Sequence, residues 1–215
     1  MNSLEIEEAK KRLKLTPRQR QILVGLMLGD GCLERTGRGE TFRLKVEQSA
    51  MHKPYVLHLY KEFRQWVLTP PRNRVLKTNG GKEGNWTFQT VSHSSLRFYG
   101  AQFYKEGRKS VPKLIDHWLT PIGLAYWFMD DGSSKSKDSK GVILNTQGFK
   151  KNEVELLTRV LVSKFSLEAQ LRKQPEGYQI YVSGRSYERF IELVEPYIIE
   201  EMKYKLPSPR RTQLA

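Results

Sequence analysis

Cysteine is almost absent from this sequence, because Cys32 is the single example among 215 residues. A disulfide within the chain is therefore excluded. The four histidines do not combine with Cys32 at a recognisable metal-binding spacing, so a structural zinc site is not expected. Any metal that this chain binds must have mainly carboxylate oxygen ligands, which suit hard cations such as Mg²⁺.

Long hydrophobic runs are also missing. The longest, ILVGLML and IGLAYWFM, fall well short of the roughly 18 residues that a membrane span requires. The N-terminal segment MNSLEIEEAKKRLKL mixes acidic and basic side chains without an apolar stretch, so neither a secretory signal nor a transit peptide is expected. We predict an intracellular protein without membrane attachment, and the compartment stays open between an organelle and bacterial or archaeal cytoplasm.

Acidic residues are in short supply: 23 Asp and Glu stand against 37 Lys and Arg, which gives a net charge of +14. This excess predicts a polyanionic partner, and nucleic acid is the first candidate. Net charge bears on association and not on fold, so charge alone also fits a basic soluble protein without such a partner. The motifs must decide between these two interpretations.

The tripeptide Leu-Thr-Pro occurs at 15–17 and again at 119–121. Thr is a favoured N-cap residue, and Pro at the next position already has a helical φ, so each tripeptide predicts the start of a helix. The two segments that follow, PRQRQILVGLMLGDG and PIGLAYWFMDDG, are apolar almost all round and end at Asp-Gly. Helices of this kind are buried against each other.

Glycines mark the middle and the end of these helices. Gly25 and Gly29 are four residues apart, so they share one helix face and would let another backbone approach closely. Gly31 and Gly132 follow the helices directly, where we predict that they end them in the left-handed conformation.

The acids at the ends of these helices do not fit a purely structural role. A carboxylate there faces the negative pole of the helix dipole, at a cost of roughly 0.3 to 1 kcal/mol. One such Asp is usually a turn residue. Asp30 and Asp131 both have this position in a basic protein, which indicates a function. A pair of acids facing nucleic-acid phosphates requires cations between them.

The segments after the two acids also correspond. Each half continues with a hairpin, an amphipathic helix, a second hairpin and a last helix; alternation in TFRLKVEQS is typical of a half-buried strand. The sequence therefore predicts an α+β fold with the order αββαββα present twice. We place the two halves at residues 1–112 and 113–207, followed by a tail at 208–215.

Here the residues resemble a known family. LVGLMLGDG (23–31) and LAYWFMDDG (124–132) are similar to two copies of the motif of the LAGLIDADG homing endonucleases, in their monomeric, two-motif branch. Further similar segments include QWVLTPP, ILNTQGF and MKYKLP, so the resemblance extends from about Leu13 to Pro207. It implies a pseudo-twofold fold with two packed motif helices and two antiparallel saddle sheets that bind DNA.

The resemblance also implies a metal site. Asp30 and Asp131 would lie side by side and hold Mg²⁺ against the scissile phosphates, helped by the backbone carbonyls of Gly29 and Asp130. Alignment of the motifs favours Asp131 over its neighbour Asp130 as the ligand. The motif positions at which this chain departs from the family are not those of the catalytic acids.

Two further pairs keep nearly the same spacing in both halves. By resemblance, Gln48 and Gln147 would order the attacking water, and Lys109 and Lys205 would offset charge that develops in the transition state. Without the repeat, both lysines also fit solvated surface charges. Adjacent acids would place the two cuts close together across the minor groove, which gives a short stagger.

The saddle sheets would place alternate side chains in successive major grooves, where Arg and Lys bind guanine and Gln or Asn bind adenine. We expect about a third of the candidates to contact bases and the others to contact phosphates or solvent. The halves differ at nearly all of these positions, which predicts an asymmetric target. The candidates are Arg35, Arg38, Arg43, Lys45, Arg72, Arg74, Lys77 and Lys82 in the first half, and Lys135, Lys137, Lys140, Arg172, Lys173 and Tyr181 in the second.

The sequence therefore predicts a monomeric, site-specific double-strand DNA endonuclease that needs Mg²⁺. The alternative is an intron maturase that binds intron RNA and does not cleave. Both motif acids are retained, which favours cleavage but leaves a dual role open. A ribosome-associated basic protein would leave the paired acids unexplained.

Overall fold

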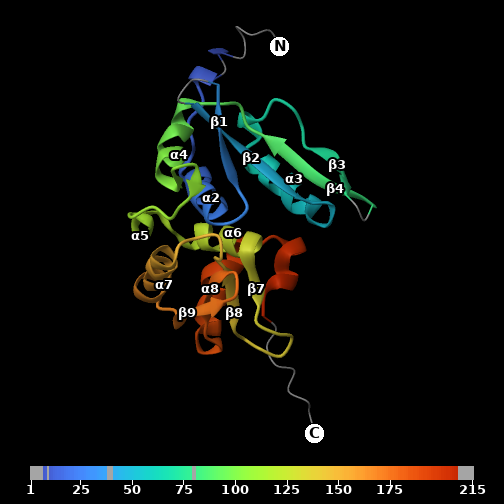
Figure 1. Ribbon diagram of the computed structural model, residues 1–215. Coiled ribbons are helices and arrows are strands. Elements are labelled where there is room, and N and C mark those ends of the chain that lie inside the picture. Colours follow the sequence, from blue (N-terminus) through green and yellow to red (C-terminus); the bar gives the residue numbers. More distant parts are fainter. Residues whose placement is uncertain (1–6, 9, 38–40, 79–80, 208–215) are drawn as a thin grey trace. The chain divides into compact units, whose positions relative to one another are not determined.

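The structure is a computed structural model that describes residues 7–8, 10–37, 41–78 and 81–207 (Figure 1). Arg38 and the tail 208–215 lie outside the described residues, as do the side chains of Lys77 and Lys82. None of the described helices is long and apolar enough to cross a membrane.

Two compact units divide the chain. The first unit combines the chain up to Arg20 with Asp30–Ala101, and the second combines Gln21–Gly29 with the chain from Gln102 onward. The bounds predicted for the two duplicated halves, 1–112 and 113–207, remain a prediction.

The first unit contains a four-stranded antiparallel sheet in the order β1-β2-β4-β3. Alternation along β2 puts Leu44 and Val46 on the buried face, and α3 packs against β2 and β4 on this side (Figure 1). Arg43 and Lys45 therefore lie on the opposite, outer face. The elements are β1 (Cys32–Thr36), β2 (Thr41–Ser49), α3 (Lys53–Glu62), β3 (Arg72–Thr78), β4 (Gly81–Gln89) and α4 (Arg97–Phe103).

The second unit repeats this topology, because its sheet has the order β7-β8-β10-β9. Helix α7 packs against β9 and β10, and α8 packs against α6. The predicted α+β class and the duplicated order of elements are thus confirmed. The elements are α6 (Pro121–Asp131), β7 (Gly132–Ser134), β8 (Val142–Asn145), α7 (Lys151–Phe165), β9 (Ala169–Gln174), β10 (Gly177–Val182) and α8 (Tyr187–Val194).

Several short elements were not predicted. The most relevant is a two-stranded hairpin, β5 with β6, in which Tyr104 pairs with Lys109. Short elements of this kind carry too few residues for a periodic signal. They are β5 (Tyr104–Lys105), β6 (Arg108–Lys109), α5 (Ile115–Trp118), η1 (Ala50–His52), η2 (Arg64–Trp66), η3 (Ser94–Leu96), η4 (Gly184–Ser186), η5 (Glu195–Tyr197) and η6 (Glu200–Lys205).

Both Leu-Thr-Pro tripeptides start helices. At α2 (Pro17–Leu28), Gln19 N–H donates to Thr16 Oγ1 at 3.1 Å and Thr16 N–H donates to Gln19 Oε1 at 3.0 Å, which forms a capping box. At α6, Gly123 N–H donates to Thr120 Oγ1 at 3.3 Å. The predicted helix starts are confirmed.

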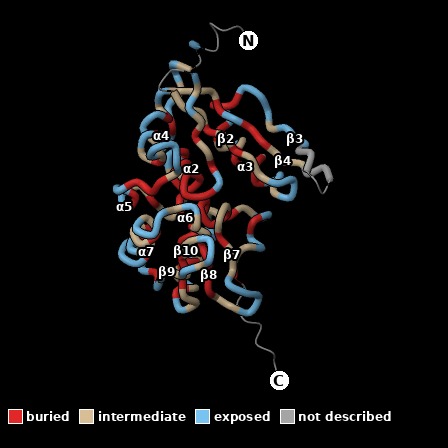
Figure 2. The backbone as a smooth tube through the Cα atoms, in the orientation of Figure 1, coloured by how far each residue is buried: buried red, intermediate tan, exposed pale blue. Residues whose placement is uncertain are grey.

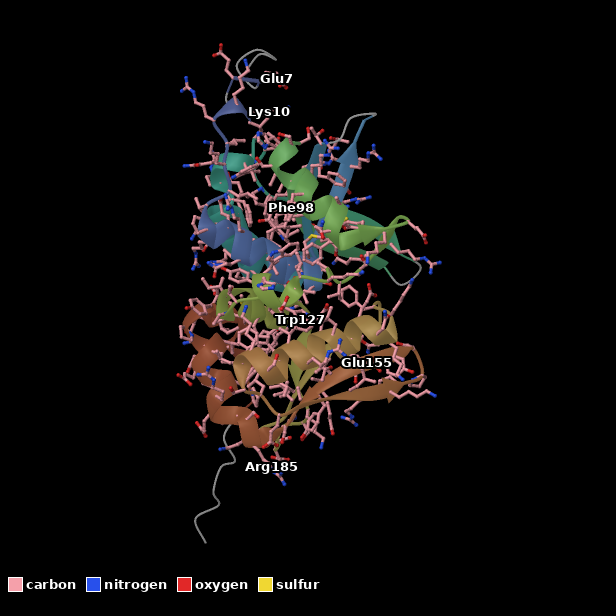
Figure 3. All side chains as sticks on the ribbon, turned by 90° about the vertical axis from the view of Figure 1, so that its left-hand side faces the viewer. Glu7, Lys10, Phe98, Trp127, Glu155 and Arg185 are labelled. Atoms are coloured by element: carbon pink, nitrogen blue, oxygen red, sulfur yellow. The ribbon has the colours of Figure 1, made fainter. Side chains whose placement is uncertain are left out.

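Within the second unit, Gln21–Gly29 packs tightly against α6. A Cβ on Gly25 would lie 2.3 Å from the carbonyl oxygen of Gly123, and a Cβ on Gly29 would lie 2.4 Å from the Cβ of Asp130. Most of α2 and α6 is buried (Figure 2), and Trp127, labelled in Figure 3, is fully buried. The close backbone approach predicted from Gly25 and Gly29 is therefore confirmed.

The predicted left-handed conformation of Gly31 and Gly132 is wrong. Gly132 is extended, with φ −88° and ψ 154°, because it begins β7 directly after α6. A Cβ on Gly132 would lie 2.0 Å from Cδ2 of Phe128, so close packing excludes a side chain. Gly31 likewise precedes a strand. Positive φ angles among described glycines occur at Gly37, Gly107 and Gly177.

We expect Gly25→Ala to lower the free energy of unfolding by about 3 kcal/mol, because the new methyl group meets helix backbone that cannot move aside alone. Urea denaturation measures this loss. Gly148→Ala is the matched control, since a Cβ there has no heavy atom within 4 Å. Equal denaturation midpoints for the two variants would contradict the close packing of Gln21–Gly29 against α6.

Candidate functional site

In the first unit, Asp30 contacts a residue at the end of β2. Asp30 follows Gly29 and is exposed. The side-chain amide of Gln48, on β2, donates from Nε2 to Oδ2 of Asp30 at 2.9 Å. Nδ1 of His52 lies 3.4 Å from the opposite end of that amide, Oε1. The structure thus brings Asp30 and Gln48 into contact.

In the second unit, two lysines bind the ends of the motif helices. Nζ of Lys109, positioned by the β5–β6 hairpin, donates to the carbonyl oxygen of Gly29. Nζ of Lys205, the last residue of η6, donates to the carbonyls of Met129 and Asp130, the latter at 2.9 Å. Each ammonium group therefore lies at the negative pole of a motif helix. This position differs from that of a solvated surface lysine.

Asp131 is the last residue of α6, and its backbone carbonyl accepts a hydrogen bond from Nδ2 of Asn145 at 3.0 Å. Asn145 in turn accepts from Nε2 of Gln179 at 2.7 Å. Gln147 lies in the turn after β8, where a Cβ on Gly177 would lie 2.8 Å from its carbonyl oxygen. Asn145, whose side chain contacts the Asp131 backbone, was not among the residues predicted from the sequence.

Strand register explains this difference. Cys32 pairs with Lys45 in the first sheet, and the corresponding Ser133 pairs with Ile143 in the second. Counting from these pairs, the counterpart of Gln48 is Thr146, which is buried and donates to the carbonyl of Tyr178 at 2.7 Å. Gln147 is one position further. The segment ILNTQ contains two amide side chains, Asn145 and Gln147, so the sequence offered Asn145 as a second candidate beside Asp131.

The donor atoms at the helix ends fit a hard cation. Asp30 with the Gly29 carbonyl, and Asp131 with the Asp130 carbonyl, supply only oxygen. The described residues contain no group of three or more His, Cys, Asp or Glu side chains that could hold a metal by themselves. Mg²⁺ typically keeps several waters and takes one or two carboxylates together with substrate phosphates. This sparse donor set therefore fits Mg²⁺.

The Asp130 side chain packs against the other motif helix. Its Oδ2 would lie 2.4 Å from a Cβ on Gly29, so the carboxylate packs directly against that glycine. A side chain at position 29 would displace it. This contact explains why the first motif has Gly29 where Asp130 stands in the second.

The predicted DNA-contacting residues of the first unit lie on its sheet. Arg35 and Arg72 are exposed on β1 and β3. Arg43, Lys45 and Arg74 are ion-paired to glutamates on the same sheet. At the level of the backbone, Lys77 pairs with Lys82 across β3 and β4.

In the second unit, cations stack on aromatic rings. Nζ of Lys135 and the guanidinium carbon of Arg172 lie 5.4 Å and 5.6 Å from the ring centroid of Tyr181. Lys140 is 4.6 Å from the ring of Tyr187 and 3.2 Å from Oε1 of Glu188, both on α8. Two further candidates are exposed, in the β7–β8 loop and on β9: Lys137 and Lys173.

Comparisons with known proteins by sequence and by structure point to the same family. A sequence model described as the LAGLIDADG DNA endonuclease family matches residues 20–190. A probable intron-encoded endonuclease 1 of Wickerhamomyces canadensis is 37% identical over 212 residues, which cover 95% of this chain and 91% of that protein. The cytochrome b mRNA maturase bI2 of Saccharomyces cerevisiae is 31% identical, with 86% of this chain and 46% of that protein covered.

Among solved structures, the homing endonuclease I-WcaI bound to its DNA recognition sequence has the same fold. Its TM-score is 0.90 and its sequence identity 37%, and the match covers 95% of this chain and 93% of that one.

Proposed function

Because the chain belongs to the LAGLIDADG DNA endonuclease family, we propose that it is a monomeric homing endonuclease that uses Mg²⁺ to cut both strands of a long asymmetric DNA site. The observation that carries this proposal is the duplicated motif helix. In each copy, an apolar helix leads to an acid, and a lysine binds the adjacent carbonyl groups. The proposal is also supported by the similar fold of I-WcaI, a homing endonuclease whose structure was solved with its DNA recognition sequence.

Asp30 and Asp131 are the proposed cation ligands, together with the carbonyls of Gly29 and Asp130. A bound cation would polarise the scissile phosphate and lower the pKa of an attacking water. The side-chain amide of Gln48 donates a hydrogen bond to the Asp30 carboxylate, and this contact fixes the orientation of both side chains in the proposed site.

Other side chains complete the proposed site. The amide groups of Gln147 and Asn145 orient water on the side of Asp131, and Asn145 joins the set because it already bonds the Asp131 carbonyl. Lys109 and Lys205 offset negative charge that develops on the phosphate during the reaction. The cuts are expected across the minor groove with a short stagger.

Cleavage of a randomised duplex library in Mg²⁺, followed by sequencing of the cut ends, tests this function. We expect a single long asymmetric site cut in both strands. The alternative is a maturase, and the observation behind it is the 31% identity to cytochrome b mRNA maturase bI2. Tight binding to intron RNA without cleavage of any duplex would support that alternative.

The two halves are expected to divide the target between them. Arg172→Gln should relax base preference on one side of the cut, and Arg43→Gln only on the other, with each lost bidentate contact costing about 1 to 3 kcal/mol. Cleavage of single-base variants of the mapped site measures this, and sedimentation of the complex gives the number of chains. Symmetric effects, or two chains per duplex, would contradict the two-half arrangement.

A further inference from the structure

Two carboxylates lie within the basic outer face of the first sheet. Glu34, on β1, accepts two hydrogen bonds from Arg43 at 2.9 and 2.7 Å and lies 3.6 Å from Nζ of Lys45. Glu47, on β2, lies 3.1 Å from Lys45 and 3.6 Å from Arg74. These five side chains, which we call the glutamate network, line one groove of about 250 Å³.

The network is partly shielded from solvent, and its contacts favour the charged forms of Lys45 and Glu47. The side chains of Glu34 and Glu47 are 30% and 20% exposed. A hydrogen bond to Glu47 is the main cause that raises the pKa of Lys45. Burial would raise the pKa of Glu47, but hydrogen bonds from Asn85 and Lys45, with the charges of Lys45 and Arg74, lower it. These ions therefore hold one another in place.

Carboxylates on a surface proposed to bind DNA need an explanation, because they repel phosphates. The fold itself does not require them. The strands of the second sheet, all of them within the described residues, contain neither Asp nor Glu. Instead, Arg172 on β9 and Lys135 in the loop after β7 lie over the ring of Tyr181. The glutamate network is therefore a feature of the first sheet that bears on what this sheet binds.

A carboxylate differs from its basic neighbours in hydrogen bonding, since it accepts and cannot donate. In the major groove, cytosine N4 and adenine N6 donate, whereas guanine O6 and N7 and thymine O4 accept. Arg and Lys donate to the accepting edges and also to any phosphate. A carboxylate held beside a cation therefore matches a base edge that donates next to a base edge that accepts.

Resting on the proposed function, we propose that Glu34 and Glu47 are specificity determinants of one half-site. Each carboxylate holds its basic partners away from phosphates and requires a cytosine or adenine amino group opposite it. Base edges that only accept, and non-specific phosphate contacts, are disfavoured. The sheet thereby gives up general affinity for DNA and gains discrimination between sequences.

Glu34→Gln and Glu47→Gln test this, because the amide keeps the shape, loses the charge and can donate. For each variant we expect affinity for a non-cognate duplex to rise about fivefold or more, as a freed cation contacts phosphate. The cleavage profile should tolerate guanine or thymine about tenfold better at one or two positions of one half-site. Preferences in the other half-site should not change.

Glu192→Gln is the control for net charge. Glu192 is exposed on α8 and pairs with Arg189 at 2.7 Å, so its loss makes the same charge change away from the sheet. Thermal unfolding of all variants reports on folding, and two independent positions keep the test valid if one variant is unstable.

Broadened preference confined to one half-site supports the proposal. A wild-type profile in both sheet variants overturns it, and so does an equal gain of affinity in Glu192→Gln. If the wild-type protein cleaves no duplex, the proposed function fails. The titrations with uncut DNA still decide whether the glutamates restrain binding.

Discussion

Asp30→Asn and Asp131→Asn are each expected to lower double-strand cleavage by roughly 10³-fold or more, because each removes one of the two negative charges proposed to hold the catalytic cation. Specific binding should stay within about tenfold of wild type, since the proposed DNA contacts are mainly on the sheets. Single-turnover cleavage measures the first quantity, and a binding titration without Mg²⁺ measures the second.

The structure makes these substitutions informative. Asp30 is exposed, and asparagine keeps an oxygen that can accept the hydrogen bond from Gln48, so little stability should be lost. The Asp131 side chain is partly exposed, and its contact with Asn145 is made by the backbone carbonyl, which asparagine retains. Loss of cleavage would thus report on the charge.

Asp130→Asn is the matched control within the motif. The Asp130 carboxylate packs against Gly29, so neutralising it should reduce cleavage much less than Asp131→Asn does. A large loss of binding with an intact cleavage rate on bound DNA would contradict the assignment of both acids. Equal losses from Asp130→Asn and Asp131→Asn would contradict the motif register.

Much of the fold could be predicted because its signals are local and occur twice. Thr16 and Thr120 mark helix starts through caps that the structure contains, and strand alternation predicts which side of β2 is buried. Each half repeats the order of the other, so an ambiguous segment in one half is resolved by its counterpart. The topology β1-β2-β4-β3 then recurs as β7-β8-β10-β9.

The misses concern features that depend on register and close packing. Position 132 requires glycine because the ring of Phe128 leaves no room for a side chain, and not because the backbone there has a positive φ. A local sequence pattern cannot distinguish these two reasons for a glycine. Spacing from the acid predicts Gln147, which stays a prediction, but it missed Asn145, which the pairing of Ser133 with Ile143 brings to the carbonyl of Asp131. Glu34 faces Arg43 across the hairpin that the sequence predicts, but the contact of Glu47 with Arg74 depends on the strand order β2-β4-β3, which the sequence does not specify.

Binding to the cognate duplex is expected to weaken about 10³-fold or more between 50 and 200 mM salt, if the protein makes six or more phosphate contacts. The basic side chains displace counterions from DNA, and their release becomes less favourable as salt rises. The Asp131→Asn variant suits this titration, because cleavage then does not remove the bound state. A flat salt response would contradict DNA as the main ligand.

The steepness of this salt dependence reports phosphates contacted and not the net charge of +14. Arg43, Lys45 and Arg74 are already paired to carboxylates, so they should add less to the slope than unpaired cations would. Replacing Glu47 by glutamine removes the carboxylate beside Arg74 and one of the two carboxylates beside Lys45. The plot of log affinity against log salt should therefore steepen by about one unit per new phosphate contact. Glu192→Gln raises the net charge equally and should leave the slope unchanged, so the two variants separate phosphate contacts from charge in general.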